Sequence, residues 1–143
     1  MQIDKLLDRK GHFVATVRPD ATVWEALELL ERHGIGALVV SADGQGAMGI
    51  VSERDIVRRL HDRRAAVLDG PVSEIMVRDL FCATPEQDVE SLMAVMTSRR
   101  IRHVPVVRED TLVGIVSIGD VVKHRLDTLE DDNRALIDFI HAR

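Results

Sequence analysis

Two seven-residue segments place a hydroxyl and a carboxylate in the same order, 65 residues apart. The first runs from Gly49 to Asp55 (GIVSERD) and the second from Gly114 to Asp120 (GIVSIGD). Each pattern predicts a buried strand that leads into a helix, with a Ser at the strand end and an Asp three residues later. Free N–H groups at a helix N-terminus favour an anion beside the Ser. The Asp is suited instead to accept hydrogen bonds from sugar hydroxyls. Phosphate and ribose together indicate a nucleotide.

The same four side chains also suit a purely structural role. Ser52 and Ser117 are good helix N-caps, and Asp55 and Asp120 are acids of the kind that first helical turns favour. The residue types alone leave both roles open.

The two copies differ in the charge expected beside them. Arg102 and His103 directly precede the Val104-Pro105 strand, whereas the first copy has Gly36 and Ala37 at the matching positions. A guanidinium offers a planar fork of donors that fits a phosphate. We therefore expect one strongly cationic cleft, which contains Arg102, His103, Ser117 and Asp120. The other cleft, around Ser52 and Asp55, is expected to bind a less charged or larger ligand, to bind weakly, or to stay empty.

An internal repeat organises most of the chain. Pro19 matches Pro85 and Val40 matches Val106 at an offset of 66, and the offset becomes 65 from Gly49 onward. One extra residue in the loop between Asp43 and Met48 explains this shift, because loops tolerate insertions. A unit of about 60 residues buries little surface alone, so we expect two copies to pack together with clefts between them.

Periodicity and turn residues predict the elements of both copies. The first unit is expected to contain strands Phe13–Val17, Ala37–Val40 and Met48–Val51, a helix capped by Thr22 and Glu25, and a helix Glu53–Arg64. The second is expected to contain strands Leu80–Ala83, Val104–Val107 and Leu112–Val116, a helix Gln87–Arg99, and a helix from about Gly119. Ala65–Pro71 is the predicted linker, and Ser73 the predicted cap of a short turn at Glu74–Val77.

Composition narrows the classes of function. The chain has 143 residues, a net charge of −5, 3% aromatic residues and one cysteine, Cys82. This balance argues against nucleic-acid binding, a polybasic membrane anchor and a disulfide framework. No apolar run has the roughly 20 residues needed to span a bilayer, and the N-terminus does not resemble a secretory signal, so we expect a cytoplasmic protein. The histidines show no metal-ligand spacing. No nucleophile with its base and no glycine-rich phosphate loop is evident, so we expect no enzyme.

The chain resembles a stand-alone pair of CBS domains, often called a Bateman module. The resemblance rests on the two GIVSxxD segments, on the openings Val17–Asp20 and Ala83–Glu86, and on Arg100–Val106. It implies an α+β fold in which two pseudo-symmetric β-α-β-β-α units pack sheet to sheet, followed by a C-terminal helix. The expected domains are residues 8–66 and 74–130.

The resemblance also implies a function and a set of site residues. It implies a regulatory sensor that binds an adenine nucleotide, AMP first, or else ADP, ATP or NADH, and signals by a conformational change. Asp55 and Asp120 would contact ribose, and Ser52 and Ser117 would face phosphate. The residues expected at ligand sites are Thr16, Gly36, Ala37, Ser52, Arg54, Asp55, Cys82, Ile101, Arg102, His103, Pro105, Ser117 and Asp120.

Two other functions remain open: binding of another adenosyl ligand such as S-adenosylmethionine, and dimerisation without a ligand. For the adenine-nucleotide sensor we expect a homodimer and an unidentified regulated partner. The segment Leu126–Arg143 has helical apolar spacing in Leu129, Leu136, Ile137 and Ile140. We expect this stripe to pack at the dimer surface.

Overall fold

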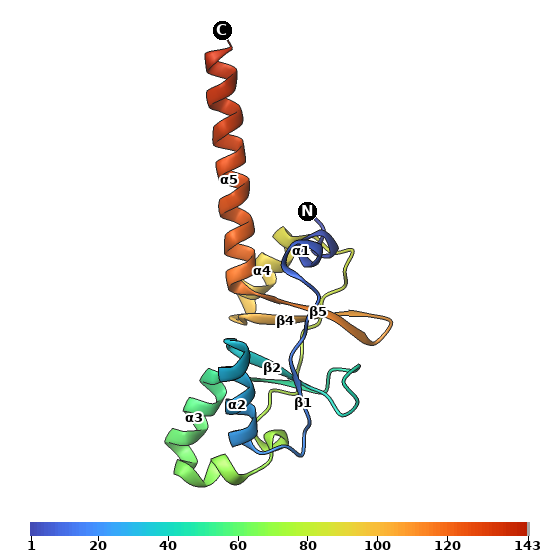
Figure 1. Ribbon diagram of the computed structural model, residues 1–143, viewed down its shortest axis with the longest axis vertical. Coiled ribbons are helices and arrows are strands. Elements are labelled where there is room, and N and C mark those ends of the chain that lie inside the picture. Colours follow the sequence, from blue (N-terminus) through green and yellow to red (C-terminus); the bar gives the residue numbers. More distant parts are fainter. Residues whose placement is uncertain (143) are drawn as a thin grey trace.

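The fold consists of two similar halves joined by a linker, with a long C-terminal helix (Figure 1). The computed structural model describes residues 1–142. The first half contains β1 (Thr16–Val17), α2 (Val23–His33), β2 (Ala37–Val40), β3 (Gly49–Ser52) and α3 (Glu53–Arg63). The second contains α4 (Val89–Arg99), β4 (His103–Arg108), β5 (Thr111–Ser117) and α5 (Ile118–His141). An N-terminal helix, α1 (Ile3–Lys10), precedes both halves, and the 3-10 turns η1 (Arg64–Asp69) and η2 (Val72–Glu74) connect them.

The two sheets face one another at the centre of the molecule, and the helices lie outside them (Figure 1). In the first sheet β1 runs parallel to β2, and β2 pairs antiparallel with β3. In the second, β4 and β5 form an antiparallel hairpin. Each half has its own hydrophobic core, one around Leu38 and Ile56 and the other around Val104 and Met96. The predicted pseudo-symmetric α+β fold with a C-terminal helix is confirmed.

Helix starts follow local capping chemistry. Thr22 Oγ1 accepts the N–H of Glu25 at 3.1 Å, and Glu25 Oε2 accepts the N–H of Thr22 at 3.3 Å, which confirms the predicted capping box of α2. Gly34 ends α2 in the left-handed region, with φ of 61°, which glycine adopts without a Cβ clash.

Several local predictions differ from the structure. The strand predicted at Phe13–Val17 covers only Thr16–Val17, and most of the linker predicted at Ala65–Pro71 is the 3-10 turn η1. Leu80–Ala83 is not a strand: the Leu80 N–H donates to Arg78 O at 3.0 Å, and this bend leaves Ala83 alone to bridge Val106. Ser73 does not cap a turn but lies within η2, because its N–H donates to Pro19 O. The helix predicted from Gln87 begins at Val89, because the Gln87 side chain accepts the N–H of Thr84 in the preceding turn.

The helix α1 was not predicted, and it completes the second half. The N–H groups of Ile3 and Asp4 donate to Gln87 O at 2.8 Å and Pro85 O at 2.9 Å. In the first half, Val72 and Ser73 make the matching bonds to Ala21 O at 2.8 Å and Pro19 O at 3.0 Å. η2, which follows the first half in the chain, therefore closes that half. In the same way α1, which precedes both halves, closes the second half.

A close contact at Gly114 fixes α1 against β5. A Cβ at this position would lie 2.6 Å from Leu7 Cδ2, and Leu7 is fully buried. Within residues 1–142, no helix is both long and apolar enough to cross a membrane.

We predict that Gly114→Ala lowers the free energy of unfolding by about 1–3 kcal/mol, because the added methyl group clashes with the buried Leu7 side chain. Denaturant unfolding measures this change. Gly46→Ala is the matched control, since its Cβ would meet nothing closer than 4.0 Å. In the double variant Leu7→Ala/Gly114→Ala the two losses should be less than additive. Full additivity would contradict the contact.

Candidate functional site

Both Ser–Asp pairs form capping boxes at the start of a helix. The Asp55 N–H donates to Ser52 Oγ at 3.2 Å, and the Ser52 N–H donates to Asp55 Oδ2 at 2.9 Å. In the second half, the Asp120 N–H donates to Ser117 Oγ at 3.2 Å, and the Ser117 N–H donates to Asp120 Oδ2 at 2.8 Å. The structural role that the residue types allowed is thus present in both halves. A carboxylate has two acceptor oxygens, and each capping box uses Oδ2, so this role leaves room for a hydroxyl ligand.

The surroundings of the two Ser–Asp pairs differ. Ser117 and Asp120 line a cavity of about 420 Å³ between the two halves. This volume is within the usual range of small-molecule sites. The complete lining is Lys10, Gly11, Phe13, Ala15, Gly34, Ile35, Gly36, Ala37, His103, Ile115, Ser117 and Asp120.

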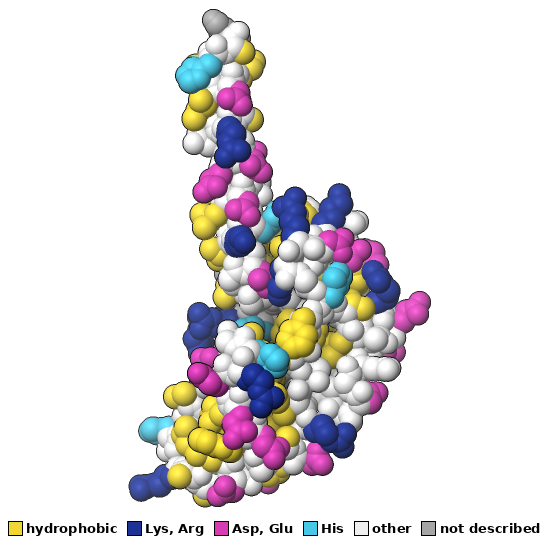
Figure 2. All heavy atoms as spheres, in the orientation of Figure 1, with side chains coloured by type: hydrophobic (Ala, Val, Ile, Leu, Met, Phe, Trp, Pro, Cys, Tyr) yellow, Lys and Arg dark blue, Asp and Glu magenta, His cyan; other side chains and the backbone are white. Residues whose placement is uncertain are grey.

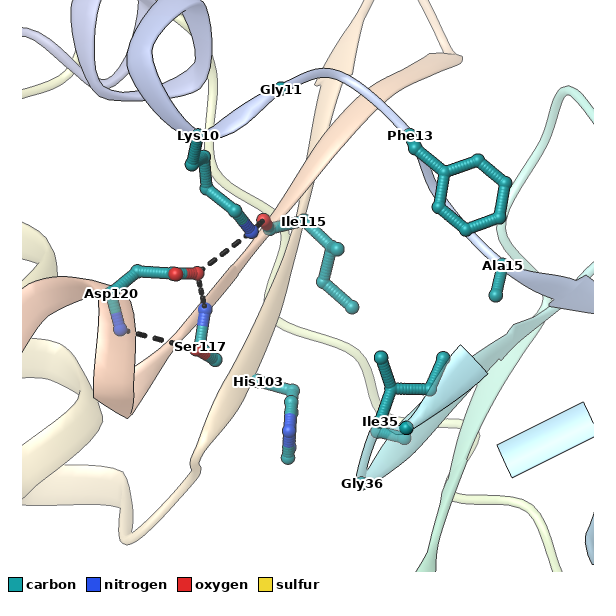
Figure 3. Close-up of a pocket in the computed structure, with 12 residues that line it drawn as sticks. Lys10, Gly11, Phe13, Ala15, Ile35, Gly36, His103, Ile115, Ser117 and Asp120 are labelled. Carbon is teal, nitrogen blue, oxygen red and sulfur yellow. Dashed lines mark hydrogen bonds and ion pairs between the residues drawn. The ribbon is translucent and has the colours of Figure 1, made fainter. Parts of the chain in front are cut away.

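The cavity is polar at one end and apolar at the other (Figure 3). Lys10, Ser117 and Asp120 gather where α1 ends and α5 begins. Phe13 and Ile35 lie on the opposite side, beside the first half. Such an arrangement suits a ligand with an apolar ring at one end and hydroxyl or anionic groups at the other.

Lys10 is a site residue that sequence reasoning missed. Its Nζ lies 2.7 Å from Asp120 Oδ2 and donates to Ile115 O at 2.6 Å (Figure 3). Burial by itself raises the pKa of Asp120, but hydrogen bonds from Lys10 and from the Ser117 backbone outweigh it and hold this pKa below its usual value. The signal for a helix was present, because Ile3, Leu6 and Leu7 have helical spacing before Gly11. The surface on which this helix packs was not readable from that spacing.

His103 lies at the middle of the cavity, between its polar and apolar ends (Figure 3). A Cβ on Gly36 would lie 3.7 Å from the His103 ring, an ordinary van der Waals distance, so the start of β2 lies close to this ring. Burial lowers the pKa of His103, and the charge of Arg102 lowers it further, against an opposing effect of Asp120. His103 is therefore a neutral donor and acceptor at pH 7 when the cavity is empty.

The structure changes the predicted grouping of residues. Gly36 and Ala37 line the same cavity as His103, Ser117 and Asp120, and not a cleft with Ser52 and Asp55. The reason is that the sheets face each other, so the start of β2 meets the start of β4. The expected cation Arg102 is exposed and does not line the cavity. Lys10, which lies outside the repeat, lines the cavity instead of Arg102 and supplies its positive charge.

The remaining predicted residues lie away from this cavity. Thr16 lines a separate surface depression with Arg18 and Glu25. Asp55 lines another, with Met76 and Val77, and Arg54 is exposed on α3. Three more belong to the second half: Cys82, half-buried with a pKa raised by burial, Ile101, packed against the core, and Pro105, buried in β4.

We predict that Lys10→Met raises the pKa of Asp120 toward its ordinary value and lowers the free energy of unfolding at pH 7 by about 1–2 kcal/mol. The side chains of Lys10 and Asp120 are only 26% and 23% exposed, so solvent screens the pair incompletely. Because the folded-state pKa is depressed, the stabilisation is present above the ordinary Asp pKa and is lost as pH falls through the folded-state value.

The measurement is the free energy of unfolding from pH 7 to pH 3, with an NMR titration of Asp120. Lys5→Met is the matched control, because Lys5 is exposed on the same helix and makes no described ion pair. If both variants lost stability equally, the Lys10–Asp120 pair would not be the source of the stabilisation.

Comparison with known proteins identifies the family to which this architecture belongs. The family model described as "CBS domain" matches residues 12–62 and 72–127. A CBS domain-containing protein of Bacillus subtilis, YhcV, is 35% identical over 130 residues, which are 90% of this chain and 89% of that protein. The mitochondrial protein CBSX3 of Arabidopsis thaliana is 40% identical over 108 residues, and the match spans 73% of this chain but only 52% of that protein.

A solved structure agrees with this assignment. The CBS-domain protein ATU1752 of Agrobacterium tumefaciens superposes with a TM-score of 0.83 at 44% identity, over 87% of this chain and 99% of that one. Two matches to one domain model, each centred on one half, explain the internal repeat. The chain belongs to the CBS-domain family and carries a tandem pair of CBS domains.

Proposed function

We propose that this protein is a regulatory module that binds one adenosyl ligand, AMP in the first place, in the cavity between its two CBS domains. The observation that carries the proposal is the cavity itself, with an apolar wall at one end, Lys10, Ser117 and Asp120 at the other, and His103 between them. Adenine suits the wall formed by Phe13 and Ile35, and ribose hydroxyls suit the Asp120 carboxylate.

The charge of the lining favours one phosphate over three. Lys10 is the cation in the lining, His103 is neutral, and Asp120 is ionised. A single phosphate would give Lys10 a second anionic partner and would accept a hydrogen bond from His103. A triphosphate would bring more negative charge than these residues can pair. ADP, ATP and NADH are thus weaker candidates than AMP.

A second candidate is a ligand without phosphate, such as S-adenosylmethionine. The near balance of charge between Lys10 and Asp120 favours it. The CBS domain pair of MJ0100 was solved in complex with 5′-methylthioadenosine and S-adenosyl-L-methionine. At 23% identity that structure shows the shared fold alone, so the choice between ligands depends on measurement.

The position of the cavity suggests how binding is signalled. Ser117 is the N-cap of α5 and Asp120 lies in its first turn, while Lys10 is the last residue of α1. A ribose at Asp120 and a phosphate at Lys10 would give each member of this ion pair a second partner, and so would weaken the contact that joins the two helices. A ligand shifts such an equilibrium only as far as it binds one arrangement more tightly than the other.

We predict that AMP raises the thermal midpoint, by an amount equivalent to about 2.7 kcal/mol at a hundredfold excess over its dissociation constant. Calorimetry with AMP, ADP, ATP, NADH and S-adenosylmethionine ranks the ligands. Asp120→Ala should weaken binding about tenfold or more, as loss of a charge-assisted hydrogen bond does. If none of the ligands bound at millimolar concentration, the module would be a ligand-free dimerisation unit.

Asp55→Ala is the matched control for that substitution. It removes an equivalent capping box but lies outside the cavity. The affinity of Asp55→Ala for AMP should stay at the wild-type value. Both variants lose about 1 kcal/mol of stability with the cap, and Asp120→Ala also loses the ion pair with Lys10. Equal loss of affinity in both variants would contradict the assignment of the site to Asp120.

We also predict that binding of AMP takes up a proton at His103. A phosphate beside the ring raises the His103 pKa, which is depressed in the empty cavity. Because the bound-state pKa is the higher one, this contribution to affinity is fully present below the free-state pKa. It is lost as pH rises through the bound-state value, by up to about tenfold for each unit between them.

Isothermal titration between pH 5 and 8 measures this dependence. A phosphate monoester itself titrates near pH 6. The quantity compared is therefore the pH dependence of AMP affinity in wild type minus that in His103→Gln. Adenosine, which lacks the phosphate, is the control ligand. A difference that stayed constant across this range would exclude His103 as the phosphate contact.

A further inference from the structure

The C-terminal helix α5 extends well beyond the body of the protein (Figure 1). Its 24 residues span about 36 Å. Hydrophobic groups recur along it between charged ones (Figure 2). Five of them, Val122, Leu126, Leu129, Leu136 and Ile140, are 46–66% exposed. Exposed hydrophobic side chains therefore continue along the part of α5 that projects from the body.

These residues follow the spacing of a coiled coil. With Asn133 included, the steps from Val122 to Ile140 are 4, 3, 4, 3 and 4 residues. This is the alternation of a and d positions in a heptad repeat, which forms one continuous stripe along a helix. Leu126, Asn133 and Ile140 then occupy a positions, and Val122, Leu129 and Leu136 occupy d positions.

The chain's own body does not cover this stripe. The start of α5 packs on α4 through buried Val121 and through His124, whose Nε2 lies 3.4 Å from Glu90 Oε1. At 3.6 residues per turn, Val121 lies roughly 100° and His124 roughly 160° around the axis from the centre of the stripe. The helix therefore docks with one face and leaves the heptad face to another molecule.

We propose that the heptad face of α5 binds α5 of a second copy of this chain, as a parallel, in-register, two-stranded coiled coil. A polar Asn at a single a position specifies register and two-stranded association, and Asn133 occupies the middle a position of the stripe. In the parallel register, Arg125 at g faces Glu130 at e of the second copy, so two pairs of opposite charge flank the seam.

This proposal needs no ligand in the cavity, so it does not depend on the proposed function. The whole protein is studied by analytical ultracentrifugation at micromolar concentrations, where a dimer is expected. Leu136→Lys places two unpaired charges in the seam and should raise the dimer dissociation constant at least about tenfold. Ala135→Lys, one residue away on the outer face, should leave it unchanged. A monomeric wild type, or Leu136→Lys protein as dimeric as wild type, would overturn the proposal.

Two further variants test the orientation and register. Arg125→Glu should weaken the dimer, and Arg125→Glu/Glu130→Arg should restore it, whereas a double variant weaker than the single one would overturn the parallel register. Ile140→Cys in a Cys82→Ala background should form an interchain disulfide on mild oxidation, because parallel helices bring the two copies of residue 140 together. A dimer that fails to cross-link at this position would overturn the parallel orientation.

Discussion

The packing of α1 against the second CBS domain is the contact on which both the fold and the cavity depend. Ile3, Leu6 and Leu7 enter the second core, and Gly114 allows Leu7 to approach β5 closely. A half of about 60 residues buries little apolar surface alone and is only marginally stable. The same packing places Lys10 beside Asp120, so one segment both closes a core and supplies the cation of the cavity.

The two domains repeat one another in backbone but not in chemistry. Ile50 and Ile115 occupy equivalent positions in the two copies of the GIVSxxD segment. Ile50 pairs through its backbone with Val77 at 3.0 and 2.8 Å, whereas the Ile115 carbonyl accepts from the Lys10 side chain. A backbone segment thus covers the first position, while a movable charged side chain covers the second. The surroundings of Asp55 and Asp120 therefore differ, and two copies of a motif need not make two equal sites.

The helix α5 links the cavity to the outer end of the molecule. Its N-cap and first turn line the cavity, its next turns pack on α4, and its exposed stripe begins at Val122. A change at Asp120 therefore acts on the base of a helix that extends about 36 Å. A rigid helix is a direct way to carry a small shift from a ligand site to a distant surface, provided that the ligand binds the two arrangements with different affinity.

The sequence by itself determined the pseudo-symmetric fold, the helix caps and the Ser–Asp pairs, because local periodicity, capping chemistry and an internal repeat all leave their record in residue order. Leu80–Ala83 was wrong as a strand, since one backbone bond at Leu80 bends the chain, and propensity does not report such a bond. Only the tertiary structure decided the composition of the cavity. It joined Gly36 and Ala37 with His103, left Arg102 exposed and brought in Lys10. Which faces meet across two domains depends on long-range packing, and no spacing within one segment encodes it.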